Sequence, residues 1–314
     1  MKHPINRSQG SAPIFVIGAP RSGTTVFFEA FSRHPDLAWP SNYTGKFPTV
    51  PLFNYLRCLF DNRFYRVFGM KQQYDVRWFK KYLFFPGEAY SFWNHYTGLG
   101  DRFAKTYLKG VRARPEEALA LRNATELIRR KQFRKRFSCK LTGPTRLQYL
   151  HSVFPNAYFI HFIRDGRSVA ESLLRVPFWR QGGGFDRPFW NEGLSPDAEG
   201  LWQQGGRQPI ELAALQWKEI VDIAKHEADS YIPTDQYIEV RYEDFVTNPE
   251  KILSNIYQAC GVNTTAADVR SWTSGFVKKS MNKKVDSLGD ETVARLEQLI
   301  GNTLKEMSYP LYHR

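Results

Sequence analysis

The stretch PIFVIGAPRSGTT, residues 13–25, decides the fold of this chain. Its apolar run from Ile14 to Ile17 predicts a buried strand that ends at Gly18. From Thr25 onward the apolar side chains recur at helical spacing, which predicts a helix. A strand, a tight loop and a helix in this order point several backbone N–H groups and the positive end of the helix dipole at one place. That place suits a phosphate or another tetrahedral anion.

The loop differs from a Walker A loop at the position of its lysine. Gly18 and Gly23 keep the G-x-x-x-x-G spacing, but Thr24 follows where a lysine is expected. The fixed positive charge lies inside the loop instead, at Arg21, whose guanidinium can neutralise an anion with two parallel hydrogen bonds. The missing lysine disfavours ordinary ATPase or kinase chemistry. The alternative without a ligand is a tight turn with a surface arginine.

The composition indicates a globular protein with an anionic partner. The chain has 314 residues, is 42% apolar and contains 24 phenylalanines, which is ample for a core. It carries 44 lysines and arginines against 31 acids, a net charge of +13. Such a charge favours nucleic acid, a membrane surface or a polyanionic cofactor as the partner, and does not choose between them. Without repeats or low-complexity tracts, we expect a single domain over residues 13–314.

The cysteines and the N-terminal residues bear on the cellular location. The three cysteines are an odd number and none has a metal-like partner at short spacing, which suits core residues in a reducing cytosol. Residues 1–12 are polar and lack the apolar core of a signal peptide, so we expect a disordered start. No apolar run approaches the roughly 20 residues that span a bilayer. The sequence therefore predicts a soluble, cytoplasmic protein.

Three further segments predict strands of the same sheet. Residues 137–141 predict a short strand that carries Lys140, and residues 157–163 predict a second buried strand before Arg164. Residues 237–240 predict another strand. We expect a P-loop-like α/β fold, a three-layer sandwich whose central, mostly parallel sheet is flanked by helices. Ligands bind at the carboxyl ends of such strands, so two charged turns could hold two ends of one polyanionic ligand.

Helices account for most of the remaining chain. They are predicted over residues 25–33, 52–68, 78–85, 115–137, 145–154, 211–228, 249–260 and 291–307, and another follows the turn at 164–168 and runs through Leu174. Residues 39–51 and 178–209 are expected to be loops, and the longer loop has the length and composition of a lid or a substrate-binding segment. The basic cluster at 129–136 is best explained as a solvated helix end, although it could contact nucleic acid or anionic lipid.

Residues 86–100 are dense in groups that can carry chemistry. Glu88 and His95 lie there among Tyr90, Trp93 and Tyr96. An aromatic environment is one way of moving the pKa of a carboxylate or an imidazole toward neutrality, so the segment is a candidate acceptor site. A packed aromatic corner with exposed polar residues explains the same pattern. The sequence leaves these two alternatives open.

Three motifs together resemble the sulfotransferases that use 3′-phosphoadenosine-5′-phosphosulfate (PAPS) as sulfuryl donor. They are Gly18-Ala-Pro-Arg-Ser-Gly-Thr-Thr25, Ile163-Arg-Asp-Gly-Arg-Ser168 with Ser172, and Arg241-Tyr-Glu-Asp244. Their order and spacing match the family over roughly residues 12–310. The resemblance implies that 3′-phosphoadenosine-5′-phosphate (PAP) is the second product.

The resemblance also implies roles for single residues. The loop that holds the 5′-phosphosulfate corresponds to Pro20, Arg21, Ser22, Gly23, Thr24 and Thr25. Arg164 and Ser172 correspond to the pair that binds the 3′-phosphate, and Ser172 sits about two helical turns after the strand. Tyr242 corresponds to a tyrosine near the nucleotide. The loop around Lys283 lies where related enzymes cover the 3′-phosphate, although the usual Arg-Lys-Gly pattern is missing.

The chemistry implied is an in-line displacement in which charge builds on the oxygen that bridges to the departing phosphate. Arg21, backbone amides and Lys140 would stabilise that charge, so no metal is required. A glutamate acts as base in the tyrosylprotein branch, but the matching position here is Asn42, which disfavours a protein-tyrosine acceptor. Glu88 is the first candidate for the catalytic base and His95 the second.

The predicted function is therefore PAPS-dependent sulfation of a hydroxyl or an amine on a small-molecule, carbohydrate or lipid acceptor. We expect no nucleic-acid partner and allow a peripheral contact with an anionic membrane. The alternatives are a P-loop nucleotide kinase, which Mg²⁺-dependent ATP hydrolysis would support, and a non-enzymatic binder of anionic polymers or membranes. Salt-sensitive binding to DNA or vesicles, with no effect of PAP, would favour the last of these.

Overall fold

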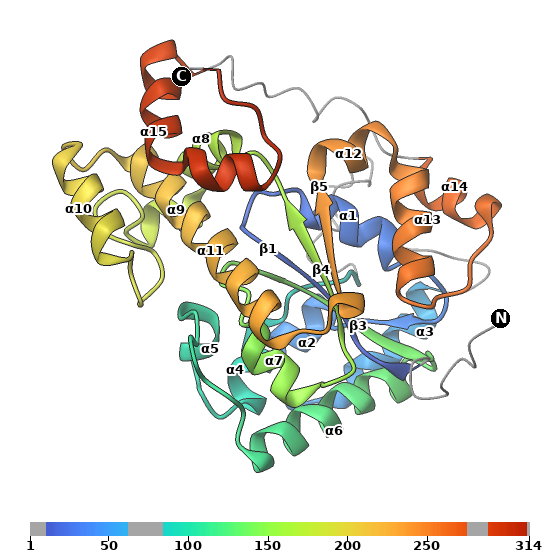
Figure 1. The fold of residues 1–314 in the computed structure, drawn as a ribbon. Helices are drawn as coiled ribbons and strands as arrows, with labels where there is room; N and C mark the ends of the chain where they lie inside the picture. The colour runs from blue at the N-terminus through green and yellow to red at the C-terminus, as the bar shows by residue number, and fades with distance from the viewer. Residues whose placement is uncertain (1–10, 62–83, 275–287, 313–314) are drawn as a thin grey trace.

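The computed structural model describes residues 11–61, 84–274 and 288–312. At its centre is a sheet of five parallel strands in the order β2-β3-β1-β4-β5 (Figure 1). The strands are β1 (Ile14–Gly18), β2 (Leu37–Ala38), β3 (Arg136–Thr142), β4 (Tyr158–Ile163) and β5 (Tyr237–Arg241). Helices cover both faces of the sheet, so the predicted three-layer α/β sandwich is confirmed.

The central strand β1 shows why the sheet is buried on both sides. Ile14 and Val16 enter the core on one face, and Phe15 and Ile17 enter the core on the other. None of the four side chains is exposed to solvent. Successive side chains of a strand point to opposite faces, so the side chains of a continuous apolar run pack alternately into the two cores on either side of the sheet.

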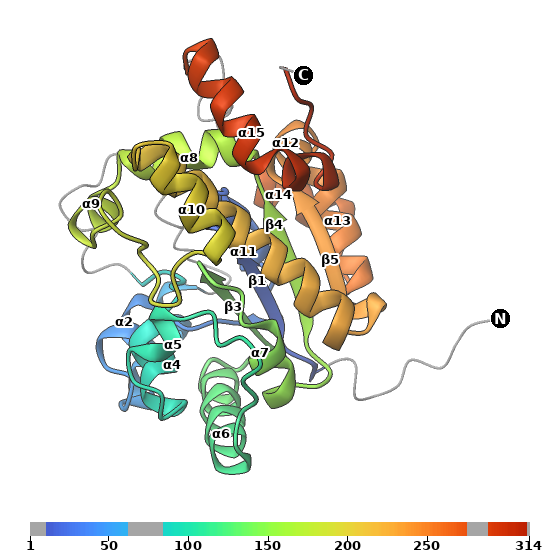
Figure 2. The same cartoon turned by 60° about the vertical axis from the view of Figure 1, so that its left-hand side comes forward.

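The helices form one layer on each face, and a third group lies at the carboxyl end of the sheet (Figures 1 and 2). The layer packed on Ile14 and Val16 consists of α1 (Thr24–Phe31), α12 (Tyr242–Thr247), α13 (Pro249–Ala259) and α14 (Ala266–Thr273). The opposite layer consists of α4 (Tyr90–Tyr96), α5 (Arg102–Lys105), α6 (Pro115–Lys131), α7 (Leu147–Val153) and α11 (Pro209–Tyr231). The third group consists of α8 (Gly166–Leu174), α9 (Pro177–Gln181), α10 (Pro196–Gln204) and α15 (Asp290–Glu306).

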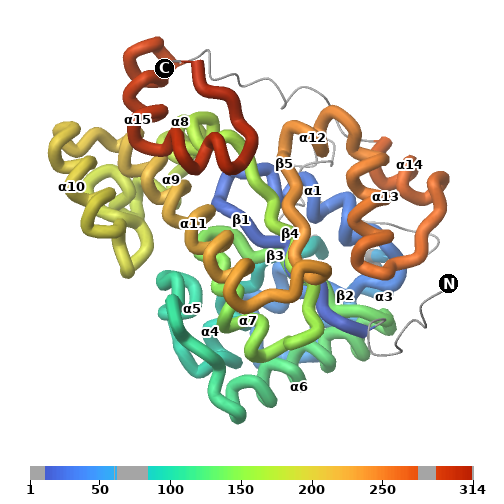
Figure 3. Tube along the Cα trace, viewed as in Figure 1, coloured from blue at the N-terminus to red at the C-terminus, as the bar shows by residue number. Residues whose placement is uncertain are grey.

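Several short elements differ from the sequence predictions. Residues 39–51 are not entirely loop, because α2 (Asn42–Lys46) begins at Ser41, whose side chain accepts the N–H of Thr44. The segment after it, visible beside β2 in Figure 3, starts as a 3₁₀ helix rather than an α-helix. The bounds are η2 (Pro51–Tyr55), α3 (Leu56–Phe60) and, before β5, η4 (Thr234–Gln236).

The remaining predicted segments fall partly outside the described residues. Residues 78–83 lie outside them, and Phe84 and Phe85 are not helical. Of the expected disordered start, Ser11 and Ala12 are described, and Ala12 is buried with its carbonyl accepting a hydrogen bond from Arg136. The single domain over residues 13–314 stays a prediction. None of the helices that the structure describes is long and apolar enough to cross a lipid bilayer.

A buried carboxyl group links α11 to the start of α7. Glu227 accepts the backbone N–H of Leu147 at 2.8 Å, and burial raises its pKa from 4.5 to about 7. A raised pKa means that the folded protein binds the proton more tightly than the unfolded chain. This contribution to stability is therefore complete below pH 4.5 and is lost as the pH rises to about 7.

Glu227→Gln is expected to raise the stability above pH 7 by up to about 3 kcal/mol, since one pKa unit corresponds to about 1.4 kcal/mol. At pH 4.5 the variant and the original protein should be almost equally stable. Urea unfolding of both proteins at both pH values measures the effect. Subtracting one protein's free energy of unfolding from the other's at each pH removes the contributions of other titrating groups, such as His161, whose pKa burial lowers to about 3. An equal gain at both pH values would show that charge on Glu227 is not the cause.

Candidate active site

The carboxyl ends of four neighbouring strands bring the predicted site residues together. The loop at 18–25 follows β1, Arg164 follows β4, and Tyr242 follows β5. Lys140 lies near the carboxyl end of β3, beside β1. Because these strands are parallel and adjacent in the order β3-β1-β4-β5, all four groups reach the same edge of the sheet.

Two glycines shape the loop at 18–25 because neither position has room for a side chain. A Cβ on Gly18 would lie 2.3 Å from the carbonyl oxygen of Phe162. A Cβ on Gly23 would lie 2.3 Å from Cδ2 of Tyr242, and Gly23 has a φ of +90° that favours glycine. The loop therefore packs directly against β4 and against Tyr242.

Hydrogen-bond donors collect where this loop enters α1. The first N–H groups of a helix have no partner within the helix, and no side chain of the described residues caps α1. The hydroxyl of Ser22 is fully buried and lacks a hydrogen-bond partner among the described residues. Donors of this kind at a helix N-terminus form a site for an anion such as a phosphate or sulfonate.

Arg21 connects this loop to the turn after β4. Its Nε donates to the hydroxyl of Ser172 at 3.0 Å, while Nη1 of Arg164 donates to the carbonyl of Arg21 at 3.2 Å. The guanidinium of Arg164 also lies over the ring of Tyr242, 4.6 Å from its centre. Burial, and then the charge of Arg164, lower the pKa of Arg21. An anion bound between the two guanidinium groups would relieve their repulsion.

Hydrogen bonds and an ion pair connect the turn that carries Arg164 to the C-terminal part of the chain. Asp165 caps α8 by accepting the N–H of Arg167, and its carboxylate also accepts two bonds from the Arg167 guanidinium, at 3.0 and 2.7 Å. Arg167 is fully buried, forms an ion pair with Glu297 of α15 and donates to the carbonyl of Pro310. These bonds fix the start of α8, which carries Ser172 one to two turns later.

A second polar cluster joins β3 to the segment before α4. Nζ of Lys140 lies 2.9 Å from a carboxylate oxygen of Glu88 and donates to the hydroxyl of Thr25 at 2.8 Å. The hydroxyl of Thr142 donates to the same oxygen of Glu88 at 2.9 Å, and Tyr90 donates to the carbonyl of Thr142. A fixed cation therefore stands between the anion-binding loop and a carboxylate.

The two candidate bases, Glu88 and His95, lie in different environments. Glu88 is part of the cluster with Lys140, whereas His95 is exposed on α4 and packs edge-on against Tyr96 at 4.8 Å. Within residues 84–274, no hydrogen bond or ion pair joins His95 to that cluster. Asn42, at the position of the expected glutamate, accepts the N–H of Phe85 and so shapes the segment that leads to Glu88. Lys283 lies outside the described residues.

Thr142 was not predicted as a site residue, and Tyr90 was named within the candidate segment 86–100 but given no role of its own. Thr142 follows Lys140 by two positions on the same strand, so both side chains point to one face of the sheet. That spacing was a usable signal. No sequence pattern predicted the contact between Glu88 and Lys140, because the two residues are far apart in the sequence and meet only through packing of α4 on the sheet.

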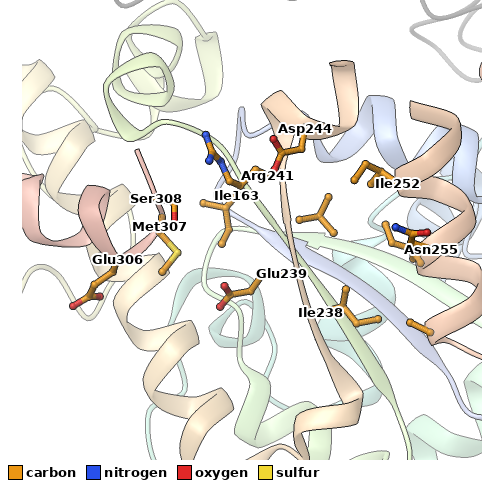
Figure 4. A pocket seen from close by; sticks show the side chains of 13 residues that line it. Ile163, Ile238, Glu239, Arg241, Asp244, Ile252, Asn255, Glu306, Met307 and Ser308 are labelled. Carbon is orange, nitrogen blue, oxygen red and sulfur yellow. The ribbon is translucent and has the colours of Figure 1, made fainter. Parts of the chain in front are cut away.

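The described part of the chain also contains a cavity away from this site. Among the described residues, no three His, Cys, Asp or Glu side chains are placed to hold a metal ion. A cavity of about 420 Å³ lies beside β5, between α13 and the end of α15 (Figure 4). Its lining includes Ile238, Arg241 and Met307 but no residue of the loop at 18–25.

Comparison with known families and structures places this chain among sulfotransferases. The model of a family described as the sulfotransferase family matches residues 13–266. The crystal structure of sulfotransferase STF9 from Mycobacterium avium is similar, with a TM-score of 0.58 and 18% identity over 97% of this chain and 79% of that one. The sulfotransferase domain from the curacin biosynthetic pathway has a TM-score of 0.50 and 16% identity, over 96% and 99% of the two chains. None of the curated proteins matches the sequence significantly.

Proposed function

This chain belongs to the sulfotransferase family, and from that premise we propose that it transfers the sulfuryl group of PAPS to a hydroxyl or an amine. The acceptor proposed is a small molecule, a carbohydrate or a lipid. The observation that carries the choice of donor is the hydrogen bond between Arg21 and Ser172, together with the bond that Arg164 donates to the carbonyl of Arg21. These bonds bring together two separate anion-binding turns. A sulfuryl donor such as PAPS, with phosphate groups at two ends, requires two such turns.

In this proposal the loop at 18–25 holds the 5′-phosphosulfate. The first N–H groups of α1, the Ser22 hydroxyl and Arg21 are its donors. Arg164 and Ser172 hold the 3′-phosphate. Tyr242 supports both halves, because its ring packs against Gly23 and carries the guanidinium of Arg164.

The reaction proposed is a single in-line displacement. The acceptor oxygen attacks sulfur, its proton passes to the carboxylate of Glu88, and the bond from sulfur to the bridging oxygen breaks to release PAP. Lys140 stabilises the negative charge that develops on the transferring group, since its ammonium lies between Thr25 and Glu88. The absence of a metal and the cytoplasmic location remain parts of the proposal that come from the sequence alone.

Glu88→Gln is expected to lower kcat at least about a hundredfold, the usual contribution of a general base. His95→Gln, the matched change at the other candidate, should keep kcat within about threefold because His95 is exposed and outside the cluster. Steady-state rates of PAP release with a fixed acceptor compare the two variants. A large loss in the His95 variant with little change in the Glu88 variant would reverse the assignment.

Transfer of labelled sulfur from PAPS tests the function directly. The protein is incubated with ³⁵S-PAPS and a panel of phenols, sterols, sugars and glycolipids, with EDTA in one half of the reactions. We expect a labelled product and an equal amount of PAP with at least one acceptor, in both halves. Release of labelled phosphate from ATP, with no binding of PAPS or PAP, would contradict the proposal.

A further inference from the structure

One surface of the molecule exposes large apolar side chains to solvent. The side chains of Leu52, Leu59 and Phe133 are 69%, 67% and 73% exposed. Phe47 and Val50 are 45% and 40% exposed. They come from the segment around η2 and α3 and from the end of α6. Large apolar side chains that gather on one exposed surface usually mark a place of interaction.

Ring contacts and a cleft link several of these side chains between η2 and the end of α6. The rings of Phe47 and Phe53 stack at 4.8 Å, and the rings of Tyr55 and Phe133 lie 5.9 Å apart. Phe47 and Val50 line one shallow cleft with Leu127 of α6. We call residues 46–61 and 126–135 together the apolar–basic face.

Basic residues outnumber acidic residues on this face. The lysines and arginines that reach its surface are Lys46, Arg129, Arg130, Lys131, Arg134 and Lys135. Its two acids already have basic partners, since Glu126 forms an ion pair with Arg129 at 2.6 Å and Asp61 with Arg57 at 2.9 Å. The surface therefore presents excess positive charge around exposed leucine and phenylalanine side chains.

The backbone holds one of the apolar groups outward. Phe133 follows the end of α6 with a φ of +53°, a left-handed conformation that favours glycine. The N–H groups of Phe133 and Arg134 donate to the carbonyls of Arg130 and Arg129, so Phe133 takes this conformation to end α6 and its ring is left exposed. Lys131 donates to Tyr55 beside it, which places a cation next to the exposed ring.

We propose that the apolar–basic face binds peripherally to an anionic lipid bilayer. Leucine and phenylalanine side chains enter the boundary between headgroups and acyl chains, and the surrounding lysines and arginines attract the anionic headgroups. Nucleic acid explains the charge but not the exposed aliphatic side chains, which find no partner on a phosphate backbone. This proposal does not depend on the acceptor or on the donor of the enzyme reaction.

Sedimentation with lipid vesicles tests the proposal on the full chain. We expect binding to phosphatidylcholine vesicles that contain about one third phosphatidylglycerol, and at least about tenfold weaker binding to pure phosphatidylcholine. Leu52→Ser with Phe133→Ser should weaken the binding about tenfold or more. Arg130→Glu with Lys135→Glu should weaken it at least about tenfold, since each cation contributes about fivefold.

Matched variants elsewhere on the surface are the controls. Leu119→Ser changes a side chain that is 56% exposed near the other end of α6, and Lys251→Glu with Lys305→Glu reverses two exposed lysines on α13 and α15. All controls should bind vesicles within about twofold of the original protein, because they leave the apolar–basic face unchanged. Vesicle binding that the controls weaken as strongly as the face variants would contradict a specific face.

Three other outcomes would also overturn the proposal. The first is no preference for anionic vesicles. The second is a dimer, seen by analytical ultracentrifugation, that Leu52→Ser with Phe133→Ser dissociates, because the face would then be covered by a second copy. The third is a large loss of melting temperature in that variant, which would mean that the face is covered within the folded chain. Tight binding of random duplex DNA that competes with vesicles would favour nucleic acid instead.

Discussion

Replacing Lys140 with methionine is expected to lower kcat about a thousandfold while the affinity for PAP changes by less than about threefold. Lys140 is the cation that touches both the anion-binding loop, through Thr25, and the carboxylate of Glu88. A preorganised donor aimed at charge that develops only in the transition state affects the rate rather than ground-state binding. Methionine keeps the length of the side chain and removes the charge.

Two measurements separate this role from a structural one. The melting temperature of the Lys140→Met variant shows whether loss of the ion pair with Glu88 has unfolded the site. The same substitution at Lys251, exposed on α13, is the control and should leave kcat and PAP affinity unchanged. If the Lys140 variant lost PAP affinity and kcat in parallel, Lys140 would be a ground-state binding residue instead.

Arg164→Ala is expected to weaken PAP binding about a hundredfold and AMP binding by less than about threefold. A charge-assisted hydrogen bond contributes about 1.5–3 kcal/mol, and about 1.4 kcal/mol corresponds to a tenfold change in affinity. The difference arises because AMP lacks the 3′-phosphate that Arg164 and Ser172 are proposed to hold. Isothermal titration calorimetry with both nucleotides measures it.

Arg175→Ala is the matched control for this prediction. Arg175 follows the same helix α8, is largely exposed and pairs with Glu171, so its removal should change neither affinity. Equal losses of PAP and AMP affinity in the Arg164 variant would contradict a contact between Arg164 and the 3′-phosphate. Arg164 would then act by holding the carbonyl of Arg21 and hence the shape of the loop.

The central strands β1 and β4 were predictable from the sequence because a parallel strand that is buried on both faces is a largely apolar run. β1, β3, β4 and β5 were all anticipated, whereas β2 has only two residues and carries no pattern. The expected loop at 178–209 in fact contains α10 and most of α9, and each helix begins with a proline, Pro196 and Pro177. The surrounding glycines hid that signal.

The two halves of the site differ in how far the sequence reveals them. The anion-binding turns were predictable since each follows a strand directly, and parallel order then brings Arg21, Arg164 and Tyr242 to one edge. The cluster of Glu88, Lys140 and Thr142 depends on how α4 packs against β3, which no local pattern encodes. Side chains that meet only through tertiary packing need the structure.

The affinity of the original protein for PAP, compared with AMP and ATP in the presence of EDTA, tests the central claim most directly, because it does not require the acceptor. With Arg164 and Ser172 holding a 3′-phosphate, PAP should bind at least about a hundredfold more tightly than AMP, and ATP no more tightly than AMP. Equal affinities for PAP and ATP would contradict a site built for a donor with a 3′-phosphate.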